Sequence, residues 1–413
     1  MIHPNPALRP MAKPIPDAHW HGEVADAASI LKHVSRLWGE ATIAHPPVAP
    51  SDGPATTHGL AVLTRASTLN LTAVARSLRE AEHIEHTVVR LGDLYPSRAT
   101  VLVADHDAPA TDDPLLDVDV TLLEQEATKS RPAVRFETIR VLVDSGKEAQ
   151  LASIASPLLV ADLQDFLWWA SSSGMGSPLF FDLASVSDRV IVDSATIRQP
   201  AVELHHLAAI VAAGTTGAKL SDFSWQRLTP WRNLIAQFFD HPRTVGALDL
   251  IDEVELTYGI GANGMSGFTG ALLLAGWLGS SLGWEAPGDL VRIRGAEPGW
   301  RVTLRGGNDA DHREVLLKVR PAADPVAGCS LASVTALAHG GRAGTFRLER
   351  VGASEVSARS DVPGIPTTRR MAFAPLPDDA SLLGEELRQF GRDGTFEAAL
   401  MLATKLAPDI TLD

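Results

Sequence analysis

Apolar residues recur along the chain with two different periods, and the change between them divides the sequence. Between residues 60 and 215, short apolar runs typical of buried strands alternate with stretches of helical periodicity. Strands are predicted over 67–75, 99–104, 116–123, 134–143 and 189–192, and helices over 76–91, 145–154 and 201–213. This alternation predicts an α/β domain, a mixed sheet with flanking helices.

Beyond about residue 216 the pattern becomes more helical and then strictly alternating. Thr229 and Pro230 are typical of a helix start, with Thr229 as the N-cap, and a long apolar helix is predicted over 266–282 after a strand at 253–258. Segments 291–294 and 301–305 alternate apolar and polar residues around a turn, which predicts a hairpin. With two closing helices over 381–390 and 396–406, this region is predicted to be an α+β domain with an antiparallel sheet.

The N-terminal segment, 1–58, differs from both regions. Residues 1–19 are rich in Pro and His and lack periodicity, so we predict a loose tail there, followed by a helix over 22–40. Four prolines between residues 45 and 59 are typical of a linker. We therefore predict a tail, helix and linker over 1–58, the α/β domain over 59–215 and the α+β domain over 216–413.

Composition narrows the class of protein. The 413 residues are 45% hydrophobic and 21% charged, as in ordinary soluble globular proteins. With 36 Lys+Arg against 50 Asp+Glu, the net charge is −14, which argues against nucleic acid as the main partner. The single cysteine, Cys329, excludes an internal disulfide framework. The N-terminal stretch MIHPNPALRPMAKPIP lacks the apolar core of a signal peptide, so we expect a cytoplasmic protein.

The charge is unevenly distributed along the chain. Residues 105–126 contain eight acids and no Lys or Arg, for which we favour a solvated loop and strand edge over an acidic docking surface. Residues 291–320 have the opposite balance, with seven Lys+Arg against four acids. The chain is therefore electrically polarised.

A glycine-rich turn is the motif closest to a cofactor site. Gly259, Gly261 and Gly264 match G-x-G-x-x-G between a predicted strand and a predicted helix, where a dinucleotide pyrophosphate could bind. However, the following segment leads into a hairpin rather than further βαβ units, and Glu285, at the spacing of a ribose-binding acid, lies in a predicted loop. We favour a flexible turn over a nucleotide site and predict no cofactor.

Other patterns argue against catalysis, a metal site and a membrane span. No P-loop occurs, and His83 and His86 share a helix face without an H-E-x-x-H pattern. Residues 265–284 are uncharged but hold five glycines and three serines, so a buried helix is favoured over a membrane span. No catalytic residue, metal ligand or membrane contact is predicted.

Four arginines of the predicted hairpin form one candidate interface. Arg292, Arg294, Arg301 and Arg305 are expected to project from one side, where they would repel one another unless they met carboxylates or phosphates. Pairing with the protein's own acids and docking of an acidic partner or a phosphorylated metabolite both remain open.

A second candidate interface combines tryptophan and arginine, which are enriched at interface hot spots. Trp225, Arg227, Trp231 and Arg232 occupy one short turn of the chain. The same tryptophans could instead be core anchors.

Several segments, taken in order, resemble the glucose-6-phosphate dehydrogenase assembly protein family (OpcA). They are 65–71 (RASTLNL), 95–98 (YPSR), 158–162 (LLVAD), 166–169 (FLWW), 188–194 (DRVIVDS), 225–232 (WQRLTPWR), 238–240 (FFD), 276–278 (GWL) and 282–284 (LGW). The resemblance runs from about residue 22 to 300, and RLTPWR is its most specific part.

The resemblance implies a non-enzymatic activator. Family members bind glucose-6-phosphate dehydrogenase and promote its active oligomer, which supports NADPH supply through the oxidative pentose phosphate pathway. In photosynthetic members cysteines are associated with thioredoxin control, but with Cys329 alone an intramolecular disulfide switch is not possible here. The alternative is an enzyme or sensor that binds a nucleotide or sugar phosphate through residues 259–264 or the arginine face.

Overall fold

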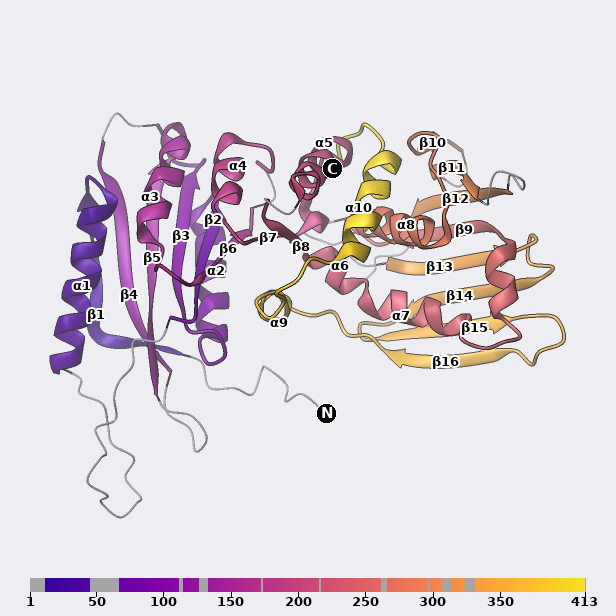
Figure 1. Cartoon of the computed structure of the whole chain (residues 1–413), viewed down its shortest axis with the longest axis horizontal. Coiled ribbons are helices and arrows are strands. Elements are labelled where there is room, and N and C mark those ends of the chain that lie inside the picture. The colour runs from indigo at the N-terminus through magenta and orange to yellow at the C-terminus, as the bar shows by residue number, and fades with distance from the viewer. Residues whose placement is uncertain are drawn as a thin grey trace, which may run out of the picture. The chain divides into compact units, whose positions relative to one another are not determined.

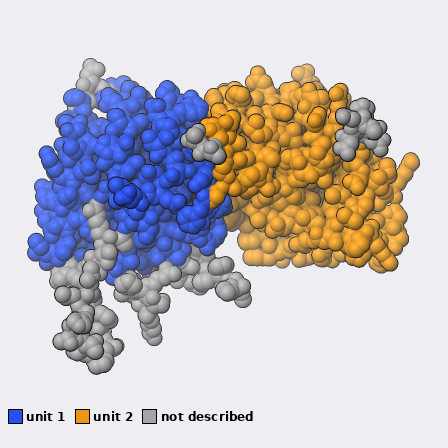
Figure 2. Space-filling model, in the orientation of Figure 1, with its two compact units in different colours: residues 1–192, 215–219, 378–390 blue, residues 193–214, 220–377, 391–413 orange. Residues whose placement is uncertain are grey.

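The computed structural model describes residues 12–44, 67–110, 114–125, 133–171, 174–214, 217–260, 266–295, 298–306, 313–323 and 331–412. These residues form two compact units, each assembled from separate stretches of chain (Figure 2). Unit 1 comprises residues 1–192, 215–219 and 378–390, and unit 2 comprises residues 193–214, 220–377 and 391–413. The sequence boundaries at 58 and 215 stay a prediction.

Unit 1 is built on a mixed sheet. In spatial order its strands are β1 (Lys13–Val24), β4 (Leu116–Gln125), β5 (Val134–Asp144), β3 (Ser97–Asp105), β2 (Leu69–Ala75), β6 (Gln164–Trp169), β7 (Arg189–Val192) and β8 (Lys219–Asp222), which begins in this unit. The pairs β1–β4 and β4–β5 are antiparallel, whereas the pairs from β5 through β7 are parallel. The central strand β3 is buried along almost its whole length, which explains its continuous apolar run.

The helices of unit 1 are α1 (Ala27–Ala44), α2 (Leu78–Leu91), α3 (Leu151–Leu158), α4 (Pro178–Ser185) and α9 (Asp379–Glu386), with the 3₁₀ helix η2 (Ser145–Gln150). In α2 the hydroxyl of Ser77 accepts a hydrogen bond from the backbone N–H of Glu80 at 3.2 Å, a normal N-cap. Although α9 is distant in sequence, it packs on α2, where His83 contacts Asp379 at 2.8 Å and Arg90 contacts Asp378 at 2.7 Å. The predicted α/β architecture is confirmed.

Two sequence predictions about this sheet are wrong, and they share a cause. The tail predicted over 1–19 and the start of the helix predicted at 22 overlap β1, which pairs with β4 from Lys13 to Val24. A register shift between Pro14 and His19 interrupts the alternation that would have identified a strand. Because β1 covers β4, the acidic residues of β4 do not lie on a sheet edge, and Asp119 contacts His19 and Arg140.

Unit 2 is built on a second sheet, largely antiparallel. In spatial order its strands are β10 (Val291–Ile293), β11 (Gly299–Gly306), β12 (Arg313–Pro321), β9 (Ile251–Tyr258), β13 (Leu331–Ala338), β14 (Gly344–Val351), β15 (Glu355–Asp361) and β16 (Thr368–Phe373) (Figure 1). The predicted antiparallel sheet is confirmed, with the addition that β9 and β12 run parallel.

The helices of unit 2 are α5 (Pro200–Ala212), α6 (Phe223–Arg227), α7 (Thr229–Phe238), α8 (Phe268–Leu282) and α10 (Gly394–Leu406), with the 3₁₀ helices η3 (Ser194–Thr196) and η5 (Val245–Leu250). One of the closest helix contacts joins α8 and α10, because Gly276 lets the backbone of Ala399 approach. In the part of the chain that the structure describes, no helix is both long and apolar enough to cross a bilayer.

The two faces of the unit 2 sheet differ sharply. Val302, Leu317, Leu256, Val334 and Leu348 point to the buried face. The opposite face is polar, and one row across it consists of Arg301, Lys318, Glu255, Thr335, Arg347, Arg359 and Arg369, all exposed or half-buried. This polar face is therefore available for contacts outside the unit.

Candidate functional site

The WQRLTPWR segment forms the end of α6 and the start of α7. Leu228 closes the first helix and is the N-cap of the second, and Pro230 lies in the first turn of α7. Thr229, predicted as the N-cap, is instead the first helical residue, and Leu228 makes no side-chain capping bond. The cause is the immediate continuation from α6, which leaves no extended residue at the junction.

Arg227 joins this segment to the DRVIVDS segment. Its Nη1 and Nη2 donate to Oδ1 and Oδ2 of Asp193 at 2.7 and 2.9 Å, which makes the pair bidentate. The two side chains are only 12% and 14% exposed. Asp193 follows β7, and Arg227 ends α6. Two stretches that carry the family resemblance, distant from each other in sequence, therefore meet in unit 2.

A second carboxylate, Asp222, lies beside this ion pair. It is 1% exposed, and its Oδ1 accepts hydrogen bonds from the backbone N–H groups of Ser194 at 3.0 Å and Ser224 at 2.8 Å. Its Oδ2 has no hydrogen-bond partner among the described residues. Burial, and then the negative charge of Asp193, raise the pKa of Asp222 to about 7. This carboxyl therefore changes charge near neutral pH.

Trp225 and Arg232 form the other half of the cluster. The indole Nε1 of Trp225 donates to Oδ2 of Asp393 at 2.8 Å, and the guanidinium of Arg232 lies 3.6 Å from the centre of the indole ring. Burial lowers the pKa of Arg232 to about 10. Trp231 is 1% exposed, and the guanidinium of Arg350 lies 5.7 Å from its ring. The tryptophans of this turn are core anchors, and the contacts found for Arg227 and Arg232 are internal to unit 2.

The arginine hairpin forms, but its four arginines do not share one side as predicted. The pair β10–β11 places Val291 opposite Arg301 and Arg292 opposite Trp300, so Arg292 lies on the face opposite to that of Arg301. The guanidinium of Arg292 lies 5.8 Å from the ring centre of Trp300. The prediction assumed that the arginines of both strands alternate onto the same face of the hairpin. The observed register shifts β10 by one residue relative to that arrangement, so Arg292 falls on the other face.

Arg301 and Arg305 share the polar face of β11, and Arg294 is exposed just beyond β10. Among the described residues none of the four hairpin arginines forms an ion pair with an acid. Internal salt bridges, one of the two possibilities left open by the sequence, are thus not found in the described part of the chain.

The glycine-rich turn is only partly described. Gly261 and Gly264 lie outside the described residues, while β9 before the turn and α8 after it confirm the predicted strand and helix. The ends of the turn meet, since the backbone N–H of Gly267 donates to the carbonyl of Gly259 at 2.9 Å. Cys329 also lies outside the described residues.

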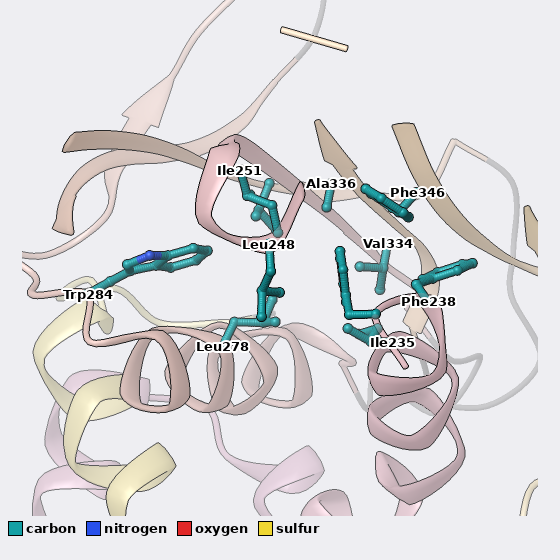
Figure 3. Close-up of a pocket in the computed structure, with 11 residues that line it drawn as sticks. Ile235, Phe238, Leu248, Ile251, Leu278, Trp284, Val334, Ala336 and Phe346 are labelled. Atoms are coloured by element: carbon teal, nitrogen blue, oxygen red, sulfur yellow. The ribbon is translucent and has the colours of Figure 1, made fainter. Parts of the chain in front are cut away.

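A small apolar cavity lies between α7, α8 and the sheet. Its volume is about 20 Å³, and its lining includes Phe238, Leu278, Trp284 and Phe346 (Figure 3). That volume accommodates little more than a water molecule, and the lining is apolar apart from the indole N–H of Trp284. The cavity is a packing gap rather than a substrate site.

Three carboxylates that organise the cluster were missed by sequence reasoning. Asp193, Asp222 and Asp393 each bind at least one group that is distant in sequence, and no spacing rule identifies those contacts. The available signal was local, since all three carboxylates also cap helices. The contacts of this cluster hold separate segments of unit 2 together.

Sequence comparisons cover most of the chain. Residues 90–209 match the glucose-6-phosphate dehydrogenase subunit N-terminal domain, and residues 218–400 match the corresponding C-terminal domain. An OxPP cycle protein OpcA from Nostoc punctiforme is 37% identical over 144 residues, 34% of this chain and 29% of that protein. The protein of the same description from Synechocystis is 27% identical over 295 residues, 67% of this chain and 57% of that protein. The matched region of this chain therefore covers at most 57% of the length of these two relatives.

Among solved structures, a scyllo-inositol dehydrogenase from Lactobacillus casei aligns over 84% of this chain and 96% of its own, with a TM-score of 0.44 and 13% sequence identity. That likeness is too distant to assign a function. The two matched domains together extend from residue 90 to 400 and include both segments joined by the Arg227–Asp193 pair. The chain belongs to the glucose-6-phosphate dehydrogenase assembly protein family, OpcA.

Proposed function

We propose that this chain binds glucose-6-phosphate dehydrogenase and promotes its active oligomeric state without catalysing a reaction itself. The observation that carries the proposal is the match of residues 90–209 and 218–400 to two domains described as parts of a glucose-6-phosphate dehydrogenase subunit. The buried bidentate pair of Asp193 and Arg227 is in keeping with this role, because it joins two segments of the fold.

Conformational linkage is a sufficient mechanism for such an activator. A protein that binds the active state of an enzyme more tightly than the inactive state shifts the population by the ratio of the two affinities. A tenfold ratio corresponds to about 1.4 kcal/mol, which a few well-placed contacts can supply. No cofactor or chemical step on this chain is needed.

The proposed contact surface is the polar face of β11 in unit 2. Arg301 and Arg305 are exposed there and form no ion pair among the described residues. Unpaired guanidinium groups are suited to carboxylates of a protein partner, which they can bind in bidentate fashion. Trp225 and Trp231 are buried and therefore support the fold rather than this surface.

The proposed function is tested by co-purification with the dehydrogenase, followed by an activity assay at sub-saturating substrate. We expect a stable complex and a higher rate, with a shift of the dehydrogenase to its larger oligomer on sedimentation. A dehydrogenase that neither binds nor changes its rate contradicts the proposal. Tight binding of NADP or glucose 6-phosphate to the isolated chain in calorimetry would instead favour a metabolite-binding enzyme or sensor.

The contact surface is tested by charge reversal on β11. Arg301→Glu combined with Arg305→Glu is expected to weaken dehydrogenase binding at least tenfold, because two cation contacts become repulsive, while the melting temperature stays within about 2 °C. The matched control is Lys32→Glu with Arg36→Glu on α1, which changes the net charge equally on exposed residues of unit 1. Equal weakening by both pairs would show a general charge effect and exclude β11 as the docking surface.

A further inference from the structure

The edge strands of the two sheets differ in how readily an additional strand could pair with them. β10 has three residues and β8 has four, so each offers a short edge. β1 is long but contains Pro14 and Pro16, has a register shift and is packed against α1. β16, the last strand of the unit 2 sheet, has six residues, contains no proline and pairs with β15 along its whole length (Figure 1). Its outer edge is therefore the most complete template for an added strand.

The side chains of β16 are exposed on both faces of the sheet. Arg369, Met371 and Phe373 lie on the polar face, where Arg369 is opposite Arg359, and Arg370 lies on the other face, opposite Ala358. Met371 is 50% exposed and Phe373 is 77% exposed. Exposed large apolar residues on an edge strand are unusual unless a partner covers them.

Apolar exposure continues from β16 onto the neighbouring strands. The register places Phe373 opposite Glu355, and Glu355 opposite Val351, which is 45% exposed. Val351, Met371 and Phe373 thus occupy one corner of the polar face. A strand added to β16 would bring its alternate side chains alongside this corner.

The charged residues of β16 indicate which kind of added strand would bind best. Arg369 and Arg370 are exposed, and neither forms an ion pair among the described residues. Because they point to opposite faces, consecutive carboxylates on an added strand could each meet one of them. A basic or neutral strand gains no such pair, and a basic one is repelled.

We infer that β16 is a docking strand for an extended acidic segment of a partner protein, which adds to the sheet as an antiparallel strand. Read antiparallel to residues 369–373, the segment has the pattern apolar, any residue, apolar, acidic, acidic. The apolar side chains meet Phe373 and Met371, and the two carboxylates meet Arg370 and Arg369. The segment need not belong to the dehydrogenase, so this docking strand goes beyond the proposed function.

The test uses the whole chain and the labelled peptide fluoresceinyl-Thr-Val-Thr-Val-Glu-Glu-Thr-amide, with anisotropy as the readout. We expect saturable binding that weakens at least tenfold when both Glu residues are replaced by Lys. A peptide N-methylated at both Val residues keeps the charge and the side chains but cannot donate backbone hydrogen bonds opposite Met371 and Phe373, and is expected to bind at least tenfold more weakly. In hydrogen exchange, the acidic peptide should slow the amides of Arg369, Met371 and Phe373, because the backbone N–H of Ala374 donates to Ser354 and residues of β16 alternate between β15 and the outer edge.

The matched protein variants are Arg369→Glu with Arg370→Glu, expected to weaken the acidic peptide at least tenfold and to improve the Lys peptide, and Lys32→Glu with Arg36→Glu, expected to change neither. Equal binding of the N-methylated and unmodified peptides would reduce the interaction to simple charge attraction and overturn the docking strand. Absence of any binding would overturn it as well. Since the dehydrogenase is absent from this assay, either result leaves the proposed function standing.

Discussion

Replacement of Gly276 by alanine is expected to lower the free energy of unfolding of unit 2 by about 3 kcal/mol, toward the upper end of overpacking effects. A Cβ at this position would lie 2.1 Å from the backbone carbonyl oxygen of Ala399 and 3.1 Å from the backbone nitrogen of Ala403. A backbone cannot rotate away as a flexible side chain can, so α8 and α10 would have to separate. The loss of packing would exceed the roughly 1 kcal/mol by which alanine normally stabilises a helix over glycine.

The same helix supplies the control. Gly270 also lies in α8, and a Cβ there would meet no atom within 4 Å. Gly270→Ala is therefore expected to raise the free energy of unfolding by about 1 kcal/mol. Urea unfolding followed by circular dichroism measures both variants, with equal m-values required for the comparison. If Gly276→Ala were as stable as Gly270→Ala, α8 and α10 would not be in close contact at this point.

Such close contacts illustrate which parts of the fold periodicity can predict. Strands β2, β3 and β5 and helix α2 were predicted because each has its own repeated pattern of apolar residues. Strand β1 was missed because a register shift breaks its pattern. The close approach at Gly276 was not predicted, since a glycine in a helix has many possible neighbours and only the tertiary structure names Ala399.

The candidate interface shows the same limit in chemical terms. The sequence correctly identified the hairpin of β10 and β11, but the face on which Arg292 lies depends on a register that a one-residue offset reverses. Likewise, WQRLTPWR was identified as a specific segment, yet Asp193, the partner of its Arg227, follows a strand in an earlier and separate stretch of the chain. The local sequence pattern predicts a helix or strand and its amphipathic character. Strand register and contacts between distant segments determine which charged side chains form ion pairs.

The largest expected effect of pH concerns Asp222. Its pKa in the folded protein is raised to about 7, whereas its ordinary value is 3.8. The folded state therefore binds this proton more tightly than the unfolded state, and the slope of stability with pH is negative between the two values. Stability contributed by the neutral carboxyl is present in full below about pH 4 and is lost as pH rises through 7. At about 1.4 kcal/mol per pKa unit, the total loss is roughly 4 kcal/mol.

Asp222→Asn should remove this dependence. The amide oxygen can still accept from the backbone N–H groups of Ser194 and Ser224, while the amide nitrogen replaces the oxygen that has no partner among the described residues. Below about pH 4 the variant resembles the protonated wild type, since both place a neutral donor on that side, and the two should have similar stability. The variant should be more stable by about 2 kcal/mol at pH 5, where the unfolded wild type is already ionised, and by about 4 kcal/mol at pH 8, because it has no buried charge beside Asp193.

Asp193→Asn is the matched control, because it changes the neighbouring carboxylate in the same way with the opposite consequence. It leaves the guanidinium of Arg227 without its bidentate acceptor, so it should destabilise the protein by about 3 kcal/mol at pH 5, and by less at pH 8, where it also removes the charge that opposes ionisation of Asp222. Urea midpoints of the wild type and both variants at the two pH values provide the measurement, and the difference between Asp222→Asn and the wild type cancels the titration of the histidines. A constant difference from pH 5 to pH 8 would mean that Asp222 is already ionised at pH 5. The free-energy cost of burying the Asp222 carboxylate would then be offset by its two backbone N–H donors alone. The ionised carboxylate would contribute equally to stability at pH 5 and at pH 8.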